Sequence, residues 1–160
     1  MRTALAAFMF VAATALSGCG AGGGYGMGSA SSGSTASSPL STAMLAGSAG
    51  YVSPAGFTIY VLSSDSFNNS TCTSTSGCTG LWPVLAPPSG ASMPLGWSSF
   101  VRSDGMTQLS YNGWPLYTYS GDSAAGQTNG NGIHSFGGVW SIARPGMAAA
   151  TGTPANDYHP

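Results

Sequence analysis

The sequence contains an internal repeat, and this feature restricts the possible folds more than any other. The segment 56–66 (GFTIYVLSSDS) returns as the segment 113–123 (GWPLYTYSGDS). Both copies contain an aliphatic residue before a tyrosine and, five positions after the tyrosine, an aspartate; Tyr60 and Tyr117 are 57 positions apart. Repetition at a fixed spacing indicates a duplicated supersecondary unit. Because there are only two copies, we expect one closed domain with approximate two-fold symmetry and not an open solenoid.

A segment with a central tryptophan follows each copy, and the surrounding pattern is that of strands. Trp82 and Trp140 are 58 positions apart, so the register of the repeat is kept. The pairs Asp104-Gly105 and Asn112-Gly113 favour tight hairpin turns. No segment after residue 50 has a helical period. Short runs of β-branched and aromatic residues between turn residues predict strands near 57–63, 81–86, 98–103, 107–111, 114–119 and 138–144.

These patterns predict an all-β fold, a small antiparallel sandwich or barrel built from two pseudo-symmetric repeats. The β-domain is expected to cover residues 51–146, with repeat 1 at about 56–86 and repeat 2 at about 113–144. Three tryptophans are expected in its core: Trp82, Trp114 and Trp140.

The first 18 residues have the order of a lipoprotein signal peptide (1–18). Arg2 supplies a positive charge, and residues 5–16 form an apolar stretch that is too short to span a bilayer. The sequence Leu16-Ser17-Gly18-Cys19 resembles the bacterial lipobox, in which the cysteine is acylated and the chain is cut just before it. We therefore expect Cys19 to carry a lipid such as palmitate and to anchor the protein to a membrane outside the cytoplasm. The alternative is an ordinary secretory signal with an incidental cysteine.

Two further segments are expected to be unstructured. Residues 19–50 are rich in glycine, serine and alanine, which predicts a flexible tether behind the lipidated cysteine. The end of the chain, 147–160, is expected to be a flexible tail. In lipoproteins of Gram-negative cells an aspartate directly after the lipidated cysteine favours retention in the inner membrane. Gly20 stands at that position, so the outer membrane is favoured if the cell is Gram-negative.

The remaining cysteines predict a disulfide. If Cys19 carries lipid, Cys72 and Cys78 are left as a pair, and an exported domain lies in an oxidising compartment where a disulfide persists. A thiolate metal site is the alternative, with His134 and His159 as further ligands.

The near absence of charge excludes whole classes of partner. Only 4% of the residues are charged, and the chain has neither lysine nor glutamate. Nucleic-acid binding needs clustered lysine or arginine to neutralise phosphates, so no nucleic-acid partner is expected. Electrostatic binding to anionic lipid is excluded for the same reason.

The repeated tyrosine and aspartate are the candidate site residues: Tyr60, Asp65, Tyr117 and Asp122. Each aspartate is expected just beyond a strand end, where it caps backbone N–H groups of a turn, while the tyrosine ring lies in the core with its hydroxyl bonded locally. In the alternative, Asp65 and Asp122 converge and, with His134, bind a cation or a polar ligand.

No catalytic motif is present. The chain lacks a G-x-S-x-G nucleophile elbow, and the β-domain offers one histidine as a base. The first hypothesis is therefore a membrane-anchored, non-enzymatic structural or binding module whose partner is an envelope protein or a small ligand. The second is an envelope accessory in metal handling or electron transfer, and a hydrolase is the least supported. No cofactor is predicted beyond a metal ion under the second hypothesis.

The order of these motifs resembles a known family. A Y-x4-D motif occurs twice, Cys78 precedes a Trp-Pro pair, and a Gly-Gly-Val-Trp segment ends at Trp140. This arrangement, over about residues 56–146, resembles the bacterial secreted-repeat lipoproteins with a Y-x4-D motif. The chain departs from that pattern in its wider cysteine spacing and in its single Pro83. The resemblance implies an envelope lipoprotein, and the family has no established activity.

Overall fold

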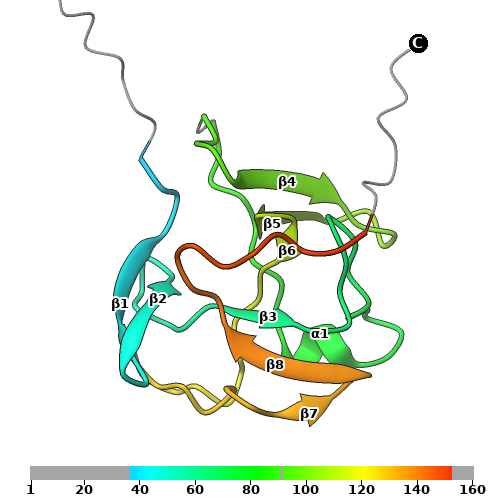
Figure 1. The fold of residues 1–160 in the computed structure, drawn as a ribbon. Coiled ribbons are helices and arrows are strands. Elements are labelled where there is room, and N and C mark those ends of the chain that lie inside the picture. The colour runs from blue at the N-terminus through cyan, green and yellow to red at the C-terminus, as the bar shows by residue number, and fades with distance from the viewer. Residues whose placement is uncertain (1–36, 91, 153–160) are drawn as a thin grey trace, which may run out of the picture. The chain divides into compact units, whose positions relative to one another are not determined.

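The computed structural model describes residues 37–90 and 92–152 (Figure 1). The predicted signal peptide, Cys19 and the start of the predicted tether lie outside the described residues, as do 153–160. The elements are β1 (Ser41–Leu45), β2 (Ser48–Val52), β3 (Tyr60–Leu62), α1 (Cys78–Leu81), β4 (Trp97–Val101), β5 (Thr107–Tyr111), β6 (Trp114–Pro115), β7 (His134–Ser135) and β8 (Gly138–Ile142).

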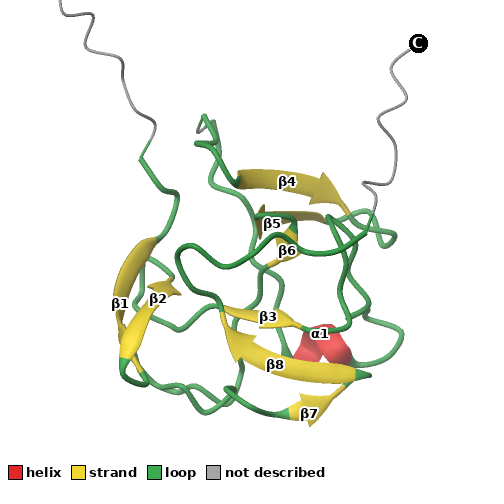
Figure 2. Cartoon of the chain, viewed as in Figure 1, coloured by secondary structure: helices red, strands yellow, loops and turns green. Residues whose placement is uncertain are grey.

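The predicted all-β class is confirmed (Figure 2). Three small antiparallel sheets have the orders β1-β2, β3-β8-β7 and β4-β5-β6. The single-turn α1 is the only helix in the part of the chain that the structure describes. The two glycine turns also form: Gly105 lies in the β4–β5 connection at φ 80°, and Asn112 and Gly113 have φ 49° and 80° between β5 and β6. Two successive positive φ angles match the right-handed strand twist of a tight hairpin.

The repeat extends further than the sequence indicated. Each half consists of a hairpin, a segment with the motif tyrosine and a segment with the tryptophan; we define the first half as residues 41–85 and the second half as residues 97–143. The backbone hydrogen bonds of the two halves correspond. The N–H of Ile59 donates to Tyr51 O in the first half, and the N–H of Leu116 donates to Leu109 O in the second.

The two halves exchange their tryptophan segments. β8, which carries Trp140, pairs with β3 of the first half. In the same way Val84, two residues after Trp82, forms a bridge with Tyr117 of the second half. Leu85 lies on one side of β5, where the N–H of Leu109 donates to Leu85 O. β4 pairs with the opposite side of β5, so β5 lies between Leu85 and β4. Each half therefore completes the sheet of the other half.

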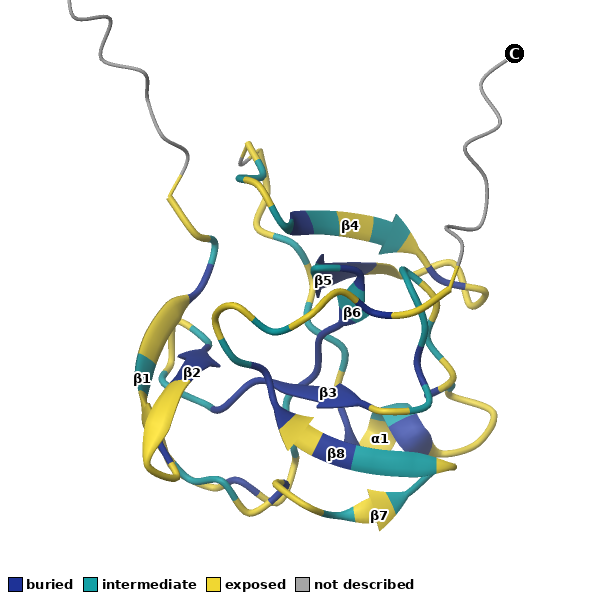
Figure 3. Cartoon of the chain, in the orientation of Figure 1, coloured by how far each residue is buried: buried dark blue, intermediate teal, exposed yellow. Residues whose placement is uncertain are grey.

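Two hydrophobic clusters fill the interior, and both draw on both halves. Figure 3 shows that β3 is buried along its whole length. The first contains Trp82 and Trp140, which are fully buried, together with the disulfide. The second is built around Ile59, Leu109 and Leu116. Each cluster needs side chains of both halves, so the apolar burial that stabilises the fold depends on contact between the halves.

The structure corrects the expected start of the β-domain. Residues 41–50, expected in the tether, form β1 and the beginning of β2. Small residues here serve close packing: a Cβ atom at Gly50 would lie 2.7 Å from Ile142 Cγ2 and 2.8 Å from Leu45 Cδ1. A run rich in glycine, serine and alanine was therefore wrongly assigned to the tether at its C-terminal end.

The expected tail and strands are also corrected. Residues 147–152 pack on the domain: Asn112 donates to Met147 O, and the N–H of Phe67 donates to Thr151 O. The segment 81–86 begins as the last residue of α1 and forms a bridge at Val84 instead of a regular strand. Trp114 is half-buried, because β6 is the edge of its sheet and the indole N–H donates to Ala148 O.

The predicted disulfide is confirmed. Cys72 and Cys78 are joined, and both residues are fully buried in the first cluster. The bond closes a short loop that leads into α1.

We expect the double substitution Cys72→Ser and Cys78→Ser to lower the free energy of unfolding by about 2 kcal/mol through loop-closure entropy alone. Urea denaturation with fluorescence detection measures this value. Wild-type protein denatured in a reducing agent is the control and should lose a similar amount. An unchanged unfolding midpoint in both would contradict a structural role for the bond.

Candidate functional site

Tyr60 and Tyr117 meet at the centre of the domain. The N–H of Tyr60 donates to Tyr117 O (2.8 Å), and the N–H of Tyr117 donates to Tyr60 O (3.0 Å). The approximate two-fold axis therefore passes between these two residues. Both tyrosines are fully buried.

The tyrosine hydroxyls form reciprocal hydrogen bonds between the halves. The Tyr60 hydroxyl donates to Asp122 Oδ2, and the Tyr117 hydroxyl donates to Asp65 Oδ2, both at 2.7 Å. Each tyrosine thus binds the aspartate of the other copy of the motif, not the aspartate five positions further along its own segment. We call this arrangement of Tyr60, Asp65, Tyr117 and Asp122 the tyrosine–aspartate lock.

The second carboxylate oxygen of each aspartate holds a loop. Asp65 Oδ1 accepts the N–H of Thr71 at 2.7 Å and its hydroxyl at 2.8 Å. Asp122 Oδ1 accepts the N–H of Asn129 at 2.9 Å. The expected capping of backbone N–H groups therefore takes place between residues six and seven positions apart. The expected local bonding of the tyrosine hydroxyl is replaced by a bond to a distant aspartate.

The tryptophans stack on the same axis. The rings of Trp82 and Trp140 are parallel, with centroids 3.7 Å apart and an angle of 4°. The ring edges of Tyr60 and Tyr117 complete the cluster, Tyr60 against Trp82 at 5.5 Å and Tyr117 against Trp140 at 5.1 Å. Each tyrosine packs on the tryptophan of its own half, whereas the stack of Trp82 on Trp140 joins the two halves.

The indole N–H groups break the symmetry. Trp140 donates to Ser135 Oγ at 3.1 Å, five positions before it. The N–H of Trp82 is buried and has no hydrogen-bond partner. Gly77 stands five positions before Trp82 and has no side chain to offer; its φ of 72° is a conformation that favours glycine.

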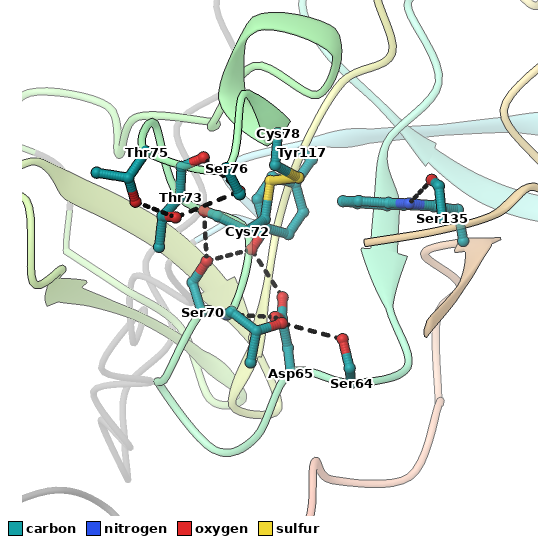
Figure 4. Close-up of a disulfide and its surroundings, with 12 residues drawn as sticks. Ser64, Asp65, Ser70, Cys72, Thr73, Thr75, Ser76, Cys78, Tyr117 and Ser135 are labelled. Atoms are coloured by element: carbon teal, nitrogen blue, oxygen red, sulfur yellow. Dashed lines mark hydrogen bonds between the residues drawn. A yellow bond between two sulfur atoms is a disulfide. The ribbon is translucent and has the colours of Figure 1, made fainter. Parts of the chain in front are cut away.

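Arg102 adds a further connection between the halves. Its guanidinium is buried, donates to Ser70 Oγ (2.8 Å) and Cys72 O (2.6 Å) of the first half, and also forms an ion pair with Asp104. Ser70 continues the network, because its hydroxyl lies 2.6 Å from that of Tyr117 (Figure 4). A chain of polar contacts therefore runs from Asp104 to Asp65.

Burial shifts the pKa values of Tyr60, Asp65 and Tyr117. Desolvation raises the pKa of Asp65 above its usual range, although the donors on Thr71 and Tyr117 and the charge of Arg102 lower it. The pKa values of Tyr60 and Tyr117 are raised by burial and by the aspartate that each one contacts. The pKa of Asp104 is lowered by its hydrogen bonds with Arg102. The tyrosines consequently remain protonated donors.

His134 lies apart from the lock. It is exposed on β7 and borders an open surface hollow with Ser63 and Val139. Within 37–90 and 92–152, no group of three or more His, Cys, Asp and Glu side chains could hold a metal ion. The sequence had suggested Asp65, Asp122 and His134 as joint ligands; the structure shows both aspartates engaged by hydroxyl and backbone donors instead.

The fold and the lock define the class of protein: a small, disulfide-bonded all-β module made of two interlocked halves. Residues 98–144 match a family described as a secreted repeat of unknown function, which confirms the resemblance seen in the sequence motifs. This segment corresponds to the second half of the domain. The match indicates an extracytoplasmic protein.

Other comparisons give no relatives. No curated protein matches the chain, and no solved structure matches it. In the described part of the chain, no helix has the length and apolar character needed to cross a membrane.

Double-mutant cycles test the reciprocal pairing. Tyr117→Phe removes the donor to Asp65, and we expect it to cost about 1–3 kcal/mol because a buried carboxylate oxygen loses its partner. Combined with Asp65→Asn, it should show a coupling energy of about 0.5–3 kcal/mol in urea denaturation. The matched control combines Tyr117→Phe with Asp122→Asn, the aspartate of the same repeat. Stronger coupling in the control would show that the pairing is local and not reciprocal.

The raised pKa of Asp65 predicts a pH dependence. Since the folded state binds this proton more tightly than the unfolded state, the contribution of Asp65 to stability is complete below the ordinary aspartate pKa of about 3.9. It is lost as the pH rises through the folded pKa. The Tm of the wild type minus that of Asp65→Asn should therefore fall as the pH is raised from about 3 to about 7. The pKa of Asp104 is shifted in the opposite direction, but Asp104 is present in both proteins, so its contribution cancels in the difference. A Tm difference that grew with pH would refute the assignment.

Proposed function

We propose that the chain is a lipid-anchored module of the cell envelope whose β-domain has a structural or binding role and catalyses no reaction. The observation that carries this proposal is the tyrosine–aspartate lock. All four side chains of the repeated motif are bound to each other or to loop donors inside the domain. These side chains hold the two halves together. Such a motif can therefore recur in proteins that share the fold but not a function.

The cysteines support the anchor. Cys72 and Cys78 are paired with each other, so Cys19, which lies outside the described residues, is the remaining cysteine of the chain. It stands in the lipobox-like sequence Leu16-Ser17-Gly18-Cys19. Lipid attached at this position anchors a protein to a membrane without a spanning helix. The outer membrane is the proposed location in a Gram-negative cell, since Gly20 follows the cysteine.

Low charge supports a passive role. The side chains of all charged residues that the structure describes bind partners inside the protein: Asp65, Arg102, Asp104, Asp122 and Arg144. Titratable groups with perturbed pKa values are candidates for catalysis when they line a cleft. The perturbed groups Tyr60, Asp65 and Tyr117 are instead buried and hydrogen-bonded inside the domain. Here the charged groups stabilise loops and hairpins.

Metabolic labelling tests the anchor. In cells fed labelled palmitate, the wild-type chain should carry the label and should sediment with the membrane fraction. Cys19→Ser should lose the label and should not be processed at that position. The Cys72→Ser/Cys78→Ser variant is the matched control and should still be labelled. An unlabelled wild-type chain released in soluble form would favour an ordinary secretory signal.

A further inference from the structure

The interface between the two halves is reciprocal, and this property has a consequence for association. We propose that the same interface can also close between two copies of this chain, the first half of one copy on the second half of the other, when the connection between the halves is too short for closure within one chain. The inference goes beyond the proposed function and does not depend on it. The partner is a second copy of this chain.

The bonds that join the halves are noncovalent and complementary. They comprise the two tyrosine–aspartate hydrogen bonds, the paired backbone of Tyr60 and Tyr117, the stack of Trp82 on Trp140, and the pairing of β3 with β8. None of these contacts requires that its two sides come from one chain. An identical element exchanged between protomers recreates the same contacts, which is the basis of domain swapping.

One covalent connection, residues 86–96, leads from the first half into the second. The described residues of this connection are largely exposed, and the side chain of Leu95 is completely exposed. Pro87 and Pro88 favour an extended chain. Met93 is the residue of the connection that packs against the second cluster. The connection otherwise acts mainly by keeping the halves at a high effective concentration, so its length decides between closure within one chain and closure between two.

Specificity comes from the buried polar groups. A half that closed on an unrelated surface would bury Asp65 or Asp122 without a tyrosine donor, which is costly in a desolvated site. A second copy supplies each missing donor at the matching position. The net charge of the chain is small, so electrostatic repulsion between two copies is weak.

Shortening the connection tests the proposal. Deletion of residues 86–95 leaves Gly96 between Leu85 and Trp97, which spans at most about 7.6 Å. Because β5 lies between Leu85 and β4, closure within one chain has to cover about two strand spacings, about 9.6 Å. We expect the exported variant to have the mass of two chains by light scattering, with the circular dichroism of the wild type. Replacement of residues 86–95 by glycine and serine at equal length is the control and should remain a single chain.

A second measurement covers the case in which the deletion does not fold. A protease site placed within 86–90 of the otherwise intact exported chain is cut after folding. The two fragments should stay together on a sizing column, and two cut preparations with different tags should exchange fragments after mild urea treatment. Fragments that separate on cutting, or a folded deletion variant with the mass of one chain, would overturn the proposal. Failure of palmitate labelling would leave both results unaffected, because neither uses the anchor.

Discussion

A buried carboxylate has to accept hydrogen bonds, and in this domain a tyrosine donor to each one lies in the opposite half. The association of the two halves depends on this requirement. Asp65 and Asp122 are buried, and each one accepts a hydroxyl from the tyrosine of the opposite half. Loss of either half would therefore leave an unpaired buried carboxyl, an unpaired phenol and a tryptophan face open to water. The polar bonds specify which surfaces meet, while the stacked indoles supply apolar burial. Both contributions act across the same axis, so they reinforce one another.

The chain has few charged residues, and the side chains of those that the structure describes hold parts of the domain together. The guanidinium of Arg102 reaches across to the carbonyl of Cys72, and that of Arg144 holds the β1–β2 hairpin through Ala49 O. Ion pairs at a surface contribute little, whereas a charge-assisted hydrogen bond to a buried carbonyl, such as that of Arg102 to Cys72 O, is stronger. Solubility is left to hydroxyl, amide and backbone groups.

The sequence predicted the all-β class, the two glycine turns and the disulfide, because each depends on local chemistry. It did not predict that Tyr60 binds Asp122, since a spacing of five within a motif suggests a local contact and reveals nothing about which half supplies the partner. Residues 41–50 were misassigned because small residues serve a flexible tether and a tightly packed hairpin equally well. An alignment of the two repeats extended toward the N-terminus could have found the first hairpin. The distance from that hairpin to Tyr60 is similar to the distance from the second hairpin to Tyr117.

Because the halves exchange their tryptophan segments, the unit that repeats in the sequence differs from the unit that has a core. These two units usually coincide. The unit of sequence recognised by the family, residues 98–144, is one repeat, but the unit that has a core is a pair of repeats. A gene that gained or lost a single repeat would produce a protein with an odd count, and one copy would be left with exposed indole and an unmatched aspartate. Growth of such a protein by duplication is therefore constrained by parity, with repeats added two at a time or completed by a neighbouring chain.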